Sequence, residues 1–213
     1  MVLCLALGLS AQDEDGTSTG SGGGVPNLAT IHAASSTQDM TAVRLRRFRS
    51  DAGAFVTVRE LFESKVSSVG MTREVSFLAV EGEPSGSALT LQWSRMYSQF
   101  AMLLANTGTF AVRDLPRAMT NYAVYDFGQV VRAGRSAQRL VVFPNRFDRA
   151  FWVIDADVQT SALLYAAEFD GQIRLLSEVE VVTFQPTARS LTTNPALTFL
   201  DYASAAGQMN VTT

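Results

Sequence analysis

The chain has 213 residues, of which 47% are hydrophobic and 17% charged, and its formal net charge is −3. This length suggests one domain with tails, and the hydrophobic content is enough for a sizeable core. A small negative net charge gives no general attraction to nucleic acid or to anionic membranes. One cysteine and one histidine exclude an internal disulfide and favour no metal site. We therefore expect no nucleic-acid partner, no metal and no cofactor.

The N-terminal segment has features of an export signal. Residues 1–11 form a short apolar run that ends in Leu9-Ser10-Ala11 and precedes an acidic stretch. This run resembles the hydrophobic region and cleavage site of a secretory signal, although no basic residue precedes it. Two alternatives stay open: the run is a buried first strand, or Cys4 carries a lipid anchor. The first interpretation predicts an exported protein, periplasmic or associated with the cell envelope.

Composition divides the rest of the chain. Residues 12–27 are acidic and then rich in Gly, Ser and Thr, which is typical of a flexible linker. We expect the folded domain over residues 28–187, starting with a short helix within 28–40, and a C-terminal tail over 188–213. No later apolar run approaches the ~18 residues that a membrane-spanning helix needs.

The first part of the domain alternates apolar and polar residues. Residues 41–49 and 54–64 predict a hairpin, and residues 73–83 predict a further strand. The run RLRRFR over 44–49 places arginines on both faces of its strand. A solvated strand is the simplest interpretation of this run. The alternative is a patch for an acidic partner or for lipid head groups.

One segment has a clear helical period. Within residues 87–108, apolar side chains recur at three- and four-residue spacing, and Ser87 and Gly108 are suitable N- and C-caps. The apolar positions are Leu89, Trp93, Met96, Tyr97, Phe100 and Leu104. Such a stripe normally packs on a sheet, and the alternative is that it borders a hydrophobic ligand cavity.

Strand patterns return after this helix. Runs at 109–114, 121–134, 135–144, 149–156, 160–169 and 172–184 are separated by turn signals. Ala133-Gly134 and Asp170-Gly171 suit tight hairpin turns, so we expect an antiparallel meander. Its apolar face would include Val153, Leu163, Tyr165, Ile173 and Leu175. The predicted fold class is α+β, mostly β: a curved antiparallel sheet with one main helix, about residues 87–106, on its concave face.

No residue set in this sequence favours catalysis. His32 lies beside the linker with no notable nucleophile nearby, so a loop or surface histidine is the simpler interpretation. Acidic residues gather at Asp155, Asp157, Glu168 and Asp170. A pair such as Asp155 and Glu168 could serve glycoside hydrolysis, but acids at turns are common for local hydrogen-bonding reasons. The glycine-rich residues 20–24 lack the features of a phosphate-binding loop.

Residues 121–184 resemble a known family. Asn121-Tyr122, then Ala133-Gly134-Arg135-Ser136-Ala137, then Pro144, then Phe151-Trp152-Val153-Ile154-Asp155 and finally Asp170-Gly171 follow its order of motifs. The pattern resembles the periplasmic lipoprotein-carrier superfamily (LolA/LolB-like), and most of all the bacterial RseB/MucB family of sigma-E regulators. Two departures are Ser136, where the family usually has proline, and residues 159–162, which replace a Gly-Leu-Pro turn. The similarity covers about a third of the chain.

The resemblance implies an incomplete β-barrel whose concave side binds acyl chains, lipoproteins or an apolar partner segment. Our first hypothesis is an exported, non-catalytic carrier or envelope-stress sensor, with a lipid, a lipoprotein or a membrane-anchored regulatory protein as partner. The candidate lining residues are Trp93, Tyr97, Phe100, Trp152, Tyr165 and Phe169. The second hypothesis is a structural or protein-interaction domain with a filled core. The third, least favoured, is an enzyme that uses Asp155 and Glu168.

Overall fold

The computed structural model describes residues 26–49, 53–68, 70–107, 110, 112, 114–146 and 149–186. Its strands are β1 (Met40–Arg49), β2 (Phe55–Ser67), β3 (Gly70–Val80), β4 (Tyr122–Arg132), β5 (Arg135–Pro144), β6 (Phe151–Asp157), β7 (Leu163–Phe169) and β8 (Leu175–Gln185). Its helices are α1 (Leu28–Thr37), α2 (Ala88–Thr107) and α3 (Leu115–Asn121). The predicted signal segment 1–11 with Cys4, most of the predicted linker, and the tail 188–213 lie outside these ranges.

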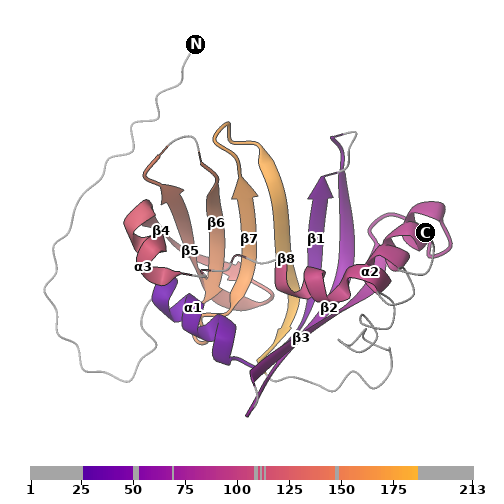
Figure 1. The fold of residues 1–213 in the computed structure, drawn as a ribbon, viewed down its shortest axis with the longest axis horizontal. Coiled ribbons are helices and arrows are strands. Elements are labelled where there is room, and N and C mark those ends of the chain that lie inside the picture. The colour runs from indigo at the N-terminus through magenta and orange to yellow at the C-terminus, as the bar shows by residue number, and fades with distance from the viewer. Residues whose placement is uncertain are drawn as a thin grey trace, which may run out of the picture.

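The eight strands form one antiparallel sheet in the order β3-β2-β1-β8-β7-β6-β5-β4. The sheet curves strongly, with β3 at one edge and β4 at the other, so the barrel is not closed (Figure 1). Alternate residues of a strand point to opposite faces, so the curvature gives each strand a concave and a convex row of side chains. The predicted fold class is confirmed.

The sheet consists of two meanders joined at one seam. Strands β1 to β3 form the first meander and β4 to β8 the second, and β1 pairs with β8 between them. The hairpin between β4 and β5 turns at Ala133 and Gly134, as predicted, with φ angles of 49° and 72°. Positive φ at both central residues is the geometry that matches the twist of the flanking strands.

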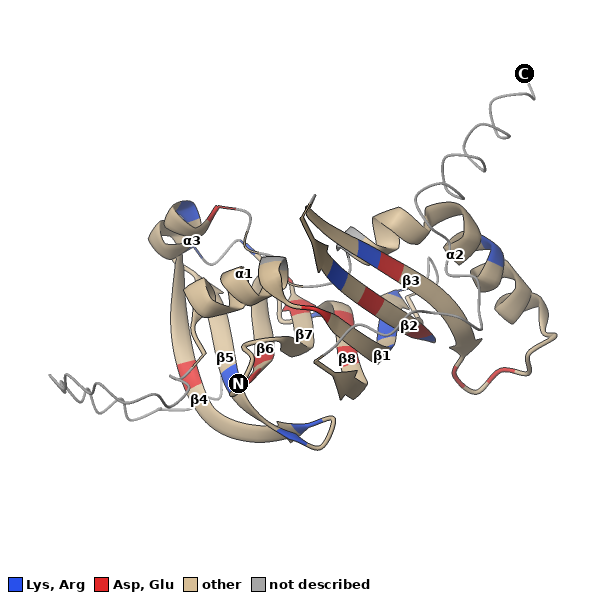
Figure 2. Cartoon of the chain, turned by 90° about the horizontal axis from the view of Figure 1, so that it is seen from below, with Lys and Arg blue, Asp and Glu red and all other residues tan. Residues whose placement is uncertain are grey.

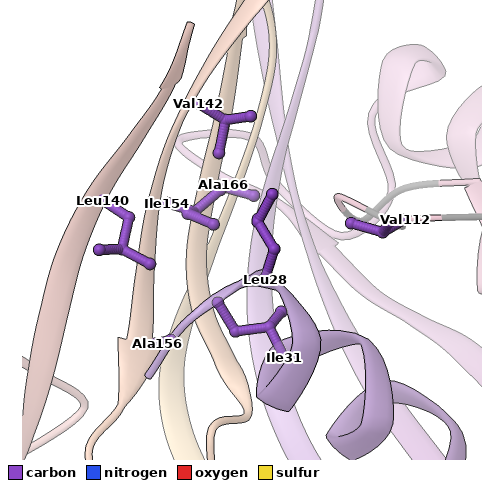
Figure 3. Close-up of a cluster of buried hydrophobic side chains, with 8 residues drawn as sticks. All are labelled: Leu28, Ile31, Val112, Leu140, Val142, Ile154, Ala156 and Ala166. Atoms are coloured by element: carbon purple, nitrogen blue, oxygen red, sulfur yellow. The ribbon is translucent and has the colours of Figure 1, made fainter. Parts of the chain in front are cut away.

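Helices α1 and α3 cover the concave face of the second meander (Figure 1). Asn27 caps α1 by accepting hydrogen bonds from the backbone N–H groups of Ala29 and Thr30. Figure 3 shows Leu28 and Ile31 of α1 facing the sheet residues around Ile154. This apolar cluster is completed by Val112, Leu140, Val142, Ala156 and Ala166.

Helix α2 packs on the first meander, against β3 and its neighbours. Ser87 caps it as predicted, since its Oγ accepts a hydrogen bond from the backbone N–H of Thr90 at 3.1 Å. The predicted apolar stripe packs on the sheet through Trp93, Tyr97 and Leu104. The helix is kinked at Phe100, whose φ and ψ of −122° and 19° are not helical, and this side chain is exposed.

Several local predictions were wrong. A strand over 109–114 is not found at its described positions, and Leu115–Asn121 is a helix instead, capped by Asp114. The turn after β7 is not a two-residue hairpin: it runs over residues 170–174, and the Asp170 side chain accepts two backbone N–H groups within it. Ile173, predicted for the apolar face, lies in this loop and is 75% exposed.

Candidate ligand cavity

A cavity lies between α1 and the concave face of the sheet, at the seam of the two meanders. The volume open to the centres of water molecules is about 60 Å³. One water needs roughly 10–15 Å³ by this measure, so the cavity has room for a few small groups. Its apolar lining includes Ile31, Phe62, Leu163, Leu164, Val179 and Val181.

The cavity has a polar end, where α1 finishes over β2 and β3. Arg73 of β3 donates a hydrogen bond from Nη2 to the backbone oxygen of Ser35, in the last turn of α1. Ser64, which pairs with Arg73 in the β2–β3 register, donates its hydroxyl to the backbone oxygen of Gln38 at 3.2 Å. The side-chain Oε1 of Gln38 is buried and receives no hydrogen bond from the described residues. All four residues line the cavity.

Beneath α2, a buried charged cluster lies beside the cavity. Arg44 and Arg46 of β1 are 1% and 3% exposed and both bind Oε1 of Glu60, at 2.5 Å and 3.0 Å. Tyr97 donates its hydroxyl to the other oxygen of Glu60 at 2.6 Å. Arg46 also donates to the backbone oxygen of Leu104, which ties β1 to α2. The prediction of a solvated strand was therefore wrong for Arg44 and Arg46, because Glu60 on the neighbouring strand lets both enter the core.

The ionisation of this cluster follows from burial and from its charges. Burial lowers the pKa of Arg44 to about 10, although Glu60 opposes this change. Burial alone would raise the pKa of Glu60, but the charges of Arg44 and Arg46 hold it below its ordinary value. Burial and the adjacent Glu60 carboxylate raise the pKa of Tyr97, so this phenol stays neutral. At neutral pH two guanidinium groups thus share one carboxylate, and the cluster keeps one net positive charge.

A second charged network lies on the convex face. Arg132 and Arg139 both bind the buried Asp155, with Arg139 forming two hydrogen bonds of 2.8 Å. Arg132 also contacts Glu180 at 2.8 Å. Tyr165 lies 4.3 Å beneath the Arg132 guanidinium, measured to the ring centroid. Figure 2 shows how charged positions are spread over the strands.

This network separates the two carboxylates of the enzyme hypothesis. Asp155 pairs with Tyr165 in the β6–β7 register, while Glu168 is three residues further along β7 and therefore on the opposite face. Asp155 is held by two arginines, and Glu168 accepts a hydrogen bond from Ser177 at 3.3 Å. The structure does not bring these carboxylates to one cleft. Among the described residues, no group of three or more His, Cys, Asp and Glu could hold a metal ion.

Of the six predicted lining residues, Tyr165 borders the cavity. Its hydroxyl donates to Glu178 at 2.7 Å, so this end of the side chain belongs to the convex network. Trp93 packs against Phe48 under α2, with ring centroids 4.6 Å apart and the ring planes tilted by 37°.

The other four residues lie apart from one another. Tyr97 is in the buried charged cluster, and Phe100 is exposed at the kink of α2. Trp152 contacts Tyr122 in the core under α1 and α3, and Phe169 stacks on Phe151 with ring centroids 5.0 Å apart. Sequence reasoning missed Arg44, Arg73 and Gln38. Only the regular alternation of β1 indicated that Arg44 shares a face with Phe48.

The architecture is that of an open β-barrel with helices on its concave side, as the resemblance predicted. Its fold resembles that of MucB, which superposes with a TM-score of 0.56 and 19% sequence identity over 78% of this chain and 59% of MucB. The MucA/MucB complex of Pseudomonas aeruginosa gives 0.53 and 18%, over 77% of this chain and 57% of the matched chain. The lipoprotein LppX of Mycobacterium tuberculosis has a TM-score of 0.38 and 13% identity, over 78% and 97% of the two chains.

These similarities concern the fold, because the identities are low. The chain spans 59% of the length of MucB. No family model and no curated protein matches the sequence. Within the described part of the chain, no helix combines the length and hydrophobicity needed to cross a bilayer.

Proposed function

We propose that this chain is a non-catalytic protein of the cell envelope that binds an acyl chain in the cavity between α1 and the sheet. The observation that carries this proposal is an apolar cavity on the concave face of an unclosed sheet, with two arginines and no carboxylate among its described lining residues. Burial of an apolar chain there would gain about 25 cal/mol for each Å² removed from water.

The cover of the cavity is the part best suited to move. Helix α1 is ten residues long, and its described apolar contact with the sheet rests mainly on Leu28 and Ile31. Isolated helices of this length are marginal in water, so α1 depends on its packing. A cavity of about 60 Å³ is below the roughly 300–1,000 Å³ of typical ligand sites. A long acyl chain would therefore enter by displacing the N-terminal half of α1, which carries Leu28 and Ile31, from the sheet.

A binding role also agrees with how the carboxylates are used. Glu60, Asp155 and Asp157 are buried, and each is bound by at least one arginine. Their arginine partners hold the pKa values of Glu60 and Asp157 below the ordinary range against the effect of burial, so these two carboxylates are poorly suited to exchange protons at neutral pH.

The test is native mass spectrometry with lipid extraction on protein purified from an envelope fraction. We expect a bound acyl lipid, which is lost in Val181→Phe because this side chain would fill the cavity. Val182→Phe is the matched control, since Val182 is the next residue of β8 and is 36% exposed on the other face. Lipid-free wild-type protein in repeated preparations, or equal lipid in both variants, would contradict the proposal.

A second candidate function, binding of a protein segment at the β4 edge, is favoured by exposed side chains there. Tyr125, Phe127 and Val131 are 43%, 56% and 75% exposed on β4, which is an edge strand of the described sheet. Edge strands usually carry charges that prevent pairing, and the two charged residues of β4 are engaged within the sheet. MucB has been solved in complex with MucA. Phe127→Asp would abolish co-purification of such a partner and leave bound lipid unchanged.

A further inference from the structure

The cavity is unusual in its balance of charge. Arg44 lies in its wall and Arg73 at its α1 end, and none of the other described lining residues is charged. An arginine that lines an apolar space is normally matched by a carboxylate, because an unmatched buried charge is costly. Here the Arg44–Arg46–Glu60 cluster carries one net positive charge beside the cavity.

Most of the hydrogen-bond donors of Arg73 are unused within the described residues. A guanidinium group has five N–H donors, and within the described residues Arg73 uses one, on the backbone oxygen of Ser35. No described carboxylate lies within ion-pair distance of it. Burial lowers the pKa of Arg73, although a guanidinium remains charged at neutral pH. Its simplest structural role is to cap the C-terminal end of α1, where carbonyl groups attract a cation. That role leaves most of its donors for a second partner.

One acceptor beside Arg73 lacks a partner. Gln38 Oε1 is buried and receives no hydrogen bond from the described residues, whereas the Ser64 hydroxyl, in register with Arg73, already donates to the backbone oxygen of Gln38. A buried acceptor without a donor costs about 1–3 kcal/mol, so natural proteins keep few of them. A monoprotonated phosphate or another head group with a hydroxyl would supply the missing hydrogen.

We infer that the cavity selects an amphiphile with a single acyl chain and an anionic head group, a carboxylate or a phosphate, that is bound by Arg73. This inference rests on the acyl-chain binding proposed above and names the class of ligand. The chain lies along Leu164 and Val181, and the head group stays at the half-buried end beside Ser64 and Gln38. We specify a single chain because a space of about 60 Å³ can hold the first part of one acyl chain. Two chains would need a much larger cavity.

The experiment is a fluorescence titration of lipid-stripped full-length protein with four probes. Palmitate and palmitoyl lysophosphatidic acid each have one chain and an anionic head. Monopalmitoylglycerol has one chain and no charge, and dipalmitoyl phosphatidic acid has an anionic head and two chains. We expect the two single-chain acids to bind about tenfold more tightly than the other two probes, which is typical of one charge-assisted contact. The stronger of the two acids identifies the head group as a carboxylate or a phosphate.

Variants locate the head group. Arg73→Gln should weaken the binding of the acids about tenfold and leave monopalmitoylglycerol unchanged, and Arg73→Lys should restore part of the loss because the charge remains. Arg95→Gln, an exposed arginine on α2, is the matched control and should change nothing. Circular dichroism confirms that each variant is folded. If an Arg73 variant does not fold, Gln38→Leu should weaken palmitoyl lysophosphatidic acid and leave palmitate unchanged, because only the monoprotonated phosphate has a hydrogen to donate to Gln38 Oε1.

The outcomes separate this inference from the proposed function. Equal affinity for palmitate and monopalmitoylglycerol, unaffected by Arg73→Gln, would overturn the anionic head group and leave acyl-chain binding intact. Tightest binding of dipalmitoyl phosphatidic acid would overturn the single chain. Failure of all four probes to bind would overturn acyl-chain binding and this inference with it.

Discussion

The two meanders of the sheet place their arginine–carboxylate networks on opposite faces. In β1 to β3 the charged cluster of Arg44, Arg46 and Glu60 is on the concave face, under α2. In β4 to β8 the concave face carries the apolar cluster around Ile154, and the network of Arg132, Arg139 and Asp155 lies on the convex face. The same residue types therefore have different roles: one set fixes a helix to the sheet from inside, and the other braces neighbouring strands from outside. The cavity lies where the two arrangements meet.

We expect the largest change in the free energy of unfolding from a substitution at Glu60. Glu60→Gln leaves two buried guanidinium groups without a carboxylate, and removing one partner of a buried ion pair costs about 3–5 kcal/mol. The free energy of unfolding, measured by urea denaturation, should fall by this amount. Glu81→Gln is the control, because Glu81 pairs with Arg59 at the surface and such pairs contribute about 0–1 kcal/mol. A similar loss of unfolding free energy in both variants would show that the buried charged cluster stabilises the fold no more than a surface ion pair does.

We expect a smaller loss of unfolding free energy when the charged network on the convex face is disrupted. Asp155→Asn removes the charge that Arg132 and Arg139 share, but both arginines are partly exposed and can be hydrated. Hydrogen bonds to charged groups contribute about 1.5–3 kcal/mol, so the unfolding free energy should fall within that range. A loss larger than that of Glu60→Gln would show that the convex network contributes more to stability than the buried charged cluster does.

The apolar face of the second meander should respond to the loss of one methyl group. Ile154 is fully buried, and Ile→Val changes at such sites cost about 0.5–1.5 kcal/mol. Ile173→Val is the matched control and should change stability by less than about 0.5 kcal/mol, because Ile173 is exposed. Thermal unfolding of the two variants side by side measures the difference. No difference would mean that this face is loosely packed.

The last predicted effect is a loss of unfolding free energy in acid, which is absent at neutral pH. Arg44 and Arg46 hold the pKa of Glu60 below its ordinary value against the opposing effect of burial, and Arg135 does the same for Asp157. The folded protein therefore binds fewer protons than the unfolded chain at these sites. Their contribution is complete above the unfolded pKa values of about 4, and is lost as the pH falls through the lower folded values.

Unfolding free energy measured at several pH values between 7 and 3 should therefore decline in acid. Glu60→Gln and Asp157→Asn should each make that decline shallower, since each removes one of the titrating groups. A decline of unchanged steepness in both variants would assign the acid sensitivity to other carboxylates.

Features of the fold that depend on neighbouring residues could be predicted from the sequence. Features that depend on contacts between residues far apart in the sequence could not. The turn at Ala133-Gly134 and the cap at Ser87 depend on neighbouring residues alone. Helix α3 lies between the predicted strands 109–114 and 121–134, where we expected only a turn. Proline is in fact favoured in the first turn of a helix, here after the cap Asp114.

The candidate site was less predictable. The burial of Arg44 depends on Glu60, 16 residues away, and the polar end of the cavity depends on where α1 comes to rest over Arg73. Nothing in the sequence near Arg73 indicates that it meets the backbone of Ser35. Aromatic residues were predicted to line the cavity, yet Trp93, Tyr97 and Trp152 fill the cores on either side of it.

The pairing of β1 with β8 has a consequence for how the chain folds. Every other strand pairing joins neighbours in sequence, whereas Thr41 at the start of the domain pairs with Gln185 at its end. Contacts between distant residues are slow to form, because the chain must first lose the entropy of closing the long loop. Each meander can therefore assemble early on local contacts, and the seam closes last. Since the cavity spans this seam, it comes into existence only in the final step of folding.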